Sequence, residues 1–73
     1  MEISKTNGKP YSLKDVIAIR DPKQQKLYIK NEVYPIDMYT TTDEITHEDK
    51  LVMLFSRTES KPLYVLWKNR ELK

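Results

Sequence analysis

The stretch that decides the fold reads Lys50-Leu51-Val52-Met53-Leu54-Phe55-Ser56. A strand with one face in water alternates apolar and polar residues, because successive side chains point to opposite faces of the sheet. Five consecutive apolar residues make both faces apolar here. We therefore expect this stretch to be the central strand of a sheet that helices cover on one side.

Two further strands are predicted upstream of the central one. The segment Ile36-Asp37-Met38-Tyr39-Thr40-Thr41-Thr42 alternates in the manner of a half-exposed strand, and Asp15–Arg20 is a short β-branched run. The loop 43–49 is short enough to join an antiparallel pair. If the apolar stretch is central, the strands lie in the order 1-3-2, numbered along the chain.

Two helices are predicted around these strands. Asp21-Pro22-Lys23-Gln24 combines an N-cap residue with proline at the first helical position, which favours a helix over residues 22–31. A second helix start at Thr58–Pro62 leads to a helix that ends near Glu71. The alternative for the first helix is a hairpin that pairs residues 17–20 with 26–30 around the loop 21–25. The predicted fold is α+β, a βαββα domain with both helices on one face of a three-stranded sheet.

The domain is expected to occupy residues 11–73. Residues 1–10 are polar and contain a Gly-Lys-Pro break, which is typical of a flexible N-terminal leader. The absence of cysteine excludes a disulfide framework and a thiolate metal site. No apolar run approaches the roughly 20 residues that span a bilayer, so a cytoplasmic protein is expected.

The charge is distributed unevenly along the chain. The formal net charge is only +2, yet four of the eleven acidic residues lie between Asp43 and Asp49, where neither lysine nor arginine occurs. The rest of the chain is accordingly more basic than the net charge implies, which favours an anionic partner and also suits an ordinary solvated surface.

Three blocks of sequence, residues 22–39, 50–55 and 59–72, carry a resemblance to known proteins. Over roughly residues 16 to 72 the chain resembles an uncharacterised family of short proteins from phages and integrated mobile elements of low-GC Gram-positive bacteria. The resemblance implies an intracellular setting and no known activity.

Catalysis and metal binding are not expected. The only cluster of side chains suited to acid-base chemistry is His47 with Glu44, Glu48 and Asp49, and its spacing matches no recognised motif. A solvated acidic turn between two strands explains these residues equally well. The chain also lacks a glycine-rich phosphate loop and a nucleophile elbow. No enzyme activity, cofactor or metal is therefore predicted.

Binding to a protein partner is the predicted function, because aromatic side chains supply much of the energy of interfaces when they are exposed. A homodimer that pairs the 39–42 edge of the second predicted strand is a further possibility. The alternative function is nucleic-acid binding by the basic face of the first helix. Its candidate residues are Lys23, Lys26 and Lys30. The candidate protein-binding residues are Tyr34, Met38, Tyr39, Glu44 and Asp49.

Overall fold

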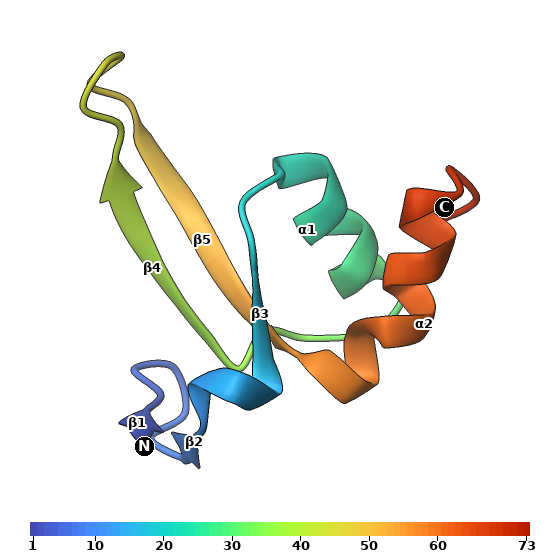
Figure 1. Cartoon of the computed structure of the whole chain (residues 1–73), viewed down its shortest axis with the longest axis horizontal. Helices are drawn as coiled ribbons and strands as arrows, with labels where there is room; N and C mark the ends of the chain where they lie inside the picture. Colours follow the sequence, from blue (N-terminus) through green and yellow to red (C-terminus); the bar gives the residue numbers. More distant parts are fainter.

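The computed structural model describes all residues from Met1 to Lys73 and shows two antiparallel sheets with two helices (Figure 1). The chain is therefore a small α+β domain, as predicted. None of its helices combines the length and apolar character needed to cross a membrane. The elements in chain order are β1 (Glu2–Ile3), β2 (Pro10–Tyr11), a 3-10 helix (Leu13–Asp15), β3 (Val16–Ile19), α1 (Pro22–Lys30), β4 (Asp37–Thr42), β5 (Asp49–Ser56) and α2 (Arg57–Lys68).

The apolar strand β5 lies at the centre of the larger sheet, in the order β3-β5-β4, which agrees with the predicted order. β3 pairs only with the C-terminal half of β5, since Val16 lies opposite Ser56 and Ile19 opposite Met53. β4 pairs with the other edge of β5 as far as its start at Asp49. The β4–β5 hairpin thus extends well beyond β3 (Figure 1), and we call its outer part, residues 39–52, the arm.

The start of α1 follows from its capping residue. The carboxylate of Asp21 accepts hydrogen bonds from the backbone N–H groups of Lys23 (2.8 Å) and Gln24 (3.3 Å). These bonds satisfy donors that have no partner inside the helix, and Pro22 at the first helical position needs none. The helical assignment of this segment is confirmed, and the hairpin alternative is wrong.

The second helix begins slightly earlier than predicted. α2 starts at Arg57, directly after β5, whereas the sequence favoured a start at Thr58 or later. The reason is that Ser56, the last residue of the strand, also serves as the N-cap: its side-chain oxygen accepts from the N–H of Glu59 at 3.3 Å.

Two apolar clusters lie on opposite faces of the larger sheet, because the side chains of β5 alternate between them. On the helix side, the rings of Tyr28 and Phe55 meet edge to face with their centroids 5.0 Å apart. The helix-side cluster consists of Ile19, Tyr28, Phe55 and Leu72, and both helices contribute side chains packed against it, among them Leu27, Leu63 and Trp67. The second cluster consists of Val16, Val52 and Leu54, against which Tyr11 and Ile36 pack.

Residues 1–11 form a second, two-stranded sheet, so the prediction of one three-stranded sheet is wrong. Residues 1–10, which were expected to be a flexible leader, all lie in this hairpin. It is attached to the start of β4 by side chains: Ser4 is only 2% exposed, and its hydroxyl donates to the carbonyl of Ile36. Because these partners are distant in sequence, no local pattern indicates the attachment.

Asp37 is the acceptor at the centre of this attachment. Its carboxylate accepts from the hydroxyl of Tyr11 at 3.0 Å and from the N–H of Lys5 at 3.1 Å. Burial by itself raises the pKa of Asp37, but hydrogen bonds from Met38, Tyr11 and Lys5 outweigh that effect, so the pKa lies below its ordinary value of 3.8. Burial and then the bond to Asp37 raise the pKa of Tyr11.

Candidate functional site

A groove of about 540 Å³ lies between the arm and α1. Its volume falls within the range of roughly 300–1,000 Å³ that is typical of ligand sites. The residues that line it are Arg20, Pro22, Gln25, Lys26, Ile29, Glu48, Asp49, Lys50, Leu51 and Met53. We call this concavity the arm groove.

One buried glutamine connects the two walls of the arm groove. The side-chain nitrogen of Gln25 donates to the carbonyl of Ile19 in β3 and to that of Leu51 in the arm, both at 2.8 Å. Each bond satisfies a strand carbonyl, and together they connect α1 to two strands. Leu51 lies on the groove side of the arm because it alternates with Met53, which packs in the helix-side cluster.

The two walls of the groove differ in charge. Arg20 and Lys26 project from the helix side, whereas the arm contributes two acids, Glu48 and Asp49, together with Lys50. The carboxylate of Asp49 accepts a hydrogen bond from the hydroxyl of Thr42 at 2.8 Å, which restricts its position. A ligand lying between these walls meets only cations on the helix side and two carboxylates beside Lys50 on the arm side.

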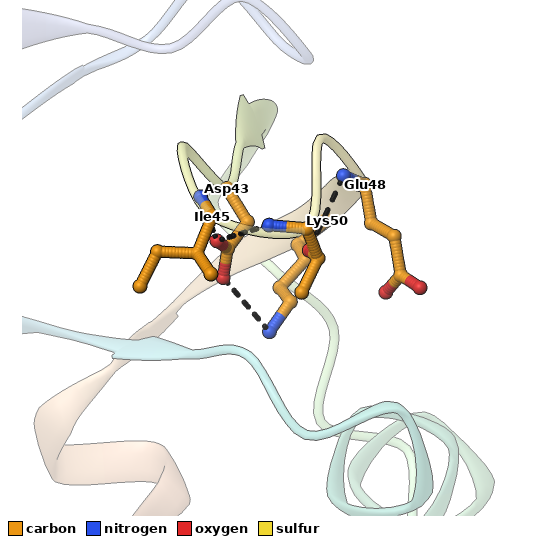
Figure 2. A network of polar contacts seen from close by, with 5 residues as sticks. Asp43, Ile45, Glu48 and Lys50 are labelled. Atoms are coloured by element: carbon orange, nitrogen blue, oxygen red, sulfur yellow. Dashed lines mark hydrogen bonds and ion pairs between the residues drawn. The ribbon is translucent and has the colours of Figure 1, made fainter.

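The loop at the tip of the arm is held together by Asp43, as Figure 2 shows. Its carboxylate accepts from the N–H groups of Ile45 (2.8 Å) and Thr46 (3.1 Å) and lies 3.8 Å from the ammonium group of Lys50. The hydrogen bonds from Thr46 and Ile45 are the largest causes that hold the pKa of Asp43 below its ordinary value. The acidic turn is thus an ordered loop, with Ile45 90% exposed at its tip.

The arm loop and the N-terminal hairpin loop share one hydrogen-bond pattern. In the arm, Asp43 N–H donates to the carbonyl of Glu48 and His47 N–H donates to the carbonyl of Asp43, at 2.9 and 2.8 Å. Ser4, Gly8 and Lys9 repeat these two bonds in the N-terminal loop, both at 2.9 Å. The equivalent residues Gly8 and His47 both have positive φ, at 72° and 59°. His47 therefore occupies a backbone conformation that favours glycine.

The five predicted protein-binding residues do not form one surface. Met38 lies opposite Met53 on the groove side of the sheet, whereas Tyr39 lies opposite Val52 on the other face. Asp49 is the only one of the five that lines the arm groove. Glu44 is exposed in the tip loop, and Tyr34 is 62% exposed in the connection between α1 and β4.

β4 is an edge strand, which is the condition for the predicted homodimer. Part of this edge is already occupied, because the N–H of Met38 donates to the carboxylate of its neighbour Asp37 at 2.9 Å. Residues 40–42 are exposed and lie beyond that point. Pairing of two copies through this segment stays a prediction.

The side chains considered for catalysis or metal binding are exposed on the arm. No group of three or more His, Cys, Asp or Glu residues is arranged to hold a metal ion. The carboxylates of Asp43 and Asp49 are engaged instead with the backbone and hydroxyl groups of the loop. The absence of enzyme activity stays a prediction.

The three lysines of α1 are exposed but do not converge on one cavity. Lys26 lines the arm groove, and Lys23 lines a separate pocket at the other side of the helix. Lys30 lines neither of them. The lysines of the predicted basic face therefore do not form one site, because they lie beside different cavities or beside none.

The sequence analysis did not identify Leu51 and Ile29 as groove residues. One signal was available for Leu51. In a strand, Asp49, Leu51 and Met53 fall on the same face. A site that includes Asp49 should therefore include Leu51 and Met53 as well. The contribution of Arg20 depends on how the β3–α1 connection packs against the arm, and no local pattern indicates that.

In comparisons of the chain with known proteins, no family model, no curated protein and no solved structure matches it. The resemblance to short phage and mobile-element proteins therefore stays a prediction.

Proposed function

We propose that the chain is a small non-catalytic protein-binding factor that recognises its partner with the arm and the arm groove. The proposal includes a phage or mobile-element origin and the modulation of a host protein, and this setting is supported only by the sequence resemblance. The non-catalytic character is supported by the sequence, in which no recognised catalytic motif occurs.

The observation that carries the proposal is the exposed apolar surface of the arm beside a charged groove. Leu51 on the groove side of the arm is 39% exposed, and Ile45 at the tip is 90% exposed. β3 pairs only with residues 53–56 of β5, so the N-terminal half of β5 keeps one open edge along the arm. Apolar and aromatic side chains on such a protrusion are suited to an interface core surrounded by a polar rim.

The groove defines the chemistry of the partner segment that it suits. Leu51, Met53 and Ile29 provide apolar surface for an inserted apolar or aromatic side chain. Arg20 and Lys26 suit a carboxylate on one flank of that side chain, and the acids of the arm suit a basic group on the other. The basic helix wall and the two acids of the arm would favour one direction of a bound segment.

The test compares two lysine substitutions on the arm. Leu51→Lys places a charge on the groove side, whereas Thr41→Lys places the same charge on the opposite face, since Thr41 pairs with Lys50. The tagged chain is used to capture partners from a nuclease-treated Gram-positive lysate. We expect a partner captured by the wild type and by Thr41→Lys, and lost with Leu51→Lys.

Affinity measured calorimetrically with the purified partner should fall at least tenfold for Leu51→Lys, the equivalent of about 1.4 kcal/mol. Circular dichroism must show that both variants are folded. Equal affinity of the two variants would place the partner elsewhere on the molecule and contradict the arm groove as the site.

The alternative, nucleic-acid binding by Lys23, Lys26 and Lys30 together, has less support because these lysines line different surroundings. It predicts an affinity that falls steeply with salt and equal losses when each lysine is neutralised.

A further inference from the structure

A second cavity, of about 430 Å³, lies between the two helices and contains only cations among its charged residues. Lys23 comes from the first turn of α1, Lys68 from the end of α2, and Arg70 from the turn that follows. Its apolar lining consists of Leu27, Trp67 and Leu72. We call this cavity the basic pocket; it is separate from the arm groove.

The charges of the basic pocket are uncompensated. The only ion pair in the structure joins Lys50 to Asp43 in the arm, so neither Lys23 nor Lys68 nor Arg70 has an anionic partner within 4.0 Å. Three like charges around one cavity repel each other and raise the local positive potential. An anion bound between them relieves that repulsion, and charge-assisted hydrogen bonds are the strongest kind available to it.

The position of Arg70 has a cost to the fold. α2 ends in a Schellman motif, in which the N–H of Arg70 donates to the carbonyl of Trp67 (3.0 Å) and that of Glu71 to the carbonyl of Leu66 (2.8 Å). Arg70 occupies the left-handed position of this motif, with φ of 59°, where glycine is the favoured residue. Arg70 thus lies beside the pocket in a backbone conformation that favours glycine, as Glu32 does at the corresponding position after α1, with φ of 64°.

The apolar lining of the basic pocket indicates which class of anion the pocket suits. A small inorganic anion needs only the cations, whereas Trp67 adds an aromatic surface next to them. Aromatic rings stack on nucleobases in a manner that tolerates any base. The cavity volume of about 430 Å³ is also within the range of sites for molecules of nucleotide size.

We propose that the basic pocket binds a nucleotide unit, with its phosphate between Lys23, Lys68 and Arg70 and its base against Trp67. The unit is either a free nucleotide or part of a single-stranded nucleic acid, since both present the same phosphate and base. This site is independent of the arm groove and of the protein-binding proposal. It assigns Lys23 to the pocket and leaves Lys30 outside it.

Trp67 is the only tryptophan of the chain, so its fluorescence reports directly on the pocket. Three probes are titrated at low salt: a short oligothymidylate, thymidine monophosphate and inorganic phosphate, with a tryptophan amide solution as the optical blank. We expect saturable quenching by at least one thymidine probe. Equal affinity per nucleotide for the two thymidine probes identifies a free-nucleotide site, and tighter binding of the oligomer identifies a strand-binding site.

For the oligomer, the one phosphate held between the three cations corresponds to a slope of about −0.7 in a plot of log K against log salt. Each of the variants Lys23→Gln and Lys68→Gln is expected to weaken binding about tenfold through the loss of one charge-assisted contact. Lys30→Gln removes the same charge from the same helix outside the pocket and should bind like the wild type.

Arg70→Gly separates binding from folding. Because glycine suits the left-handed position, this variant is expected to melt at a higher temperature than the wild type and yet to bind about tenfold more weakly. The proposal is overturned if no thymidine probe quenches Trp67 up to about 1 mM, or if inorganic phosphate binds as tightly as thymidine monophosphate. Equal losses in Lys30→Gln and Lys23→Gln also overturn it, since they indicate a diffuse charge effect.

Discussion

Replacing Gln25 with methionine removes the amide that connects α1 to the arm while keeping a side chain of similar length. The amide nitrogen donates to the carbonyls of Ile19 and Leu51, each at 2.8 Å, and Gln25 is only 5% exposed. An intramolecular hydrogen bond contributes about 1 kcal/mol net, so the loss of both should lower the free energy of unfolding by about 2 kcal/mol. The arm then loses its polar connection to the helix.

Urea denaturation followed by the fluorescence of Trp67 measures this loss, and a thermal melt should show a midpoint lower by roughly 10 °C. Lys30→Met is the matched control, since Lys30 is exposed on the same helix and its side chain makes no hydrogen bond or ion pair. Its effect should stay within about 0.5 kcal/mol. If Gln25→Met also stays within that limit, the two hydrogen bonds do not stabilise the attachment of the arm.

Two further predictions concern His47 and Asp37. His47→Gly should raise the free energy of unfolding by about 1 kcal/mol in urea denaturation, because φ at this position is 59°, where glycine is favoured. Glycine already occupies the equivalent position, Gly8, in the N-terminal loop. A lower free energy of unfolding would show that the backbone of His47 is not strained. Asp37 has a folded-state pKa below its ordinary 3.8, so its carboxylate contributes stability above that pH, and the contribution is lost as the pH falls through the folded-state pKa. Thermal melts of Asp37→Asn should therefore show lower stability at neutral pH and a smaller further loss below about pH 4 than the wild type, and identical acid profiles would refute this role.

Local signals were sufficient for most elements of the larger sheet and for α1. The apolar run of β5 predicted a central strand, and the Asp21-Pro22 pair predicted the start of α1. α2 begins earlier than predicted because Ser56 has two roles, one as the last strand residue and one as the N-cap. A local sequence pattern assigns each residue to a single element, so it does not indicate that one residue ends a strand and also caps a helix.

The second sheet was missed for a different reason. β1 and β2 have two residues each, which is too short for any alternation, although Asn7-Gly8 is a turn signal between them. What holds this hairpin is tertiary: Ser4 and Tyr11 bond to residues at the start of β4. Interactions over such a separation in sequence have no local signature.

The candidate site was predicted in part for the same physical reason. The sequence identified the arm and its acids but grouped Met38 with Tyr39, which adjacent strand positions place on opposite faces. The arm groove and the basic pocket each combine residues from separate elements, so their outlines depend on how α1 packs against the arm and α2.

The central position of β5 dictates the order in which the sheet can form during synthesis. β3 and β4 are translated first, yet neither pairs with the other, because β5 lies between them. β4 can begin to pair as soon as Asp49 and the residues after it are released, because its ladder starts beside the loop. β3 stays without a partner until Met53–Ser56 are released. The β3–β5 ladder consequently forms late and through contacts distant in sequence, which are slow to close compared with the local contacts of α1 and of the β4–β5 hairpin. Until that moment the nascent chain exposes unpaired strands, and this is the interval in which it is most exposed to aggregation.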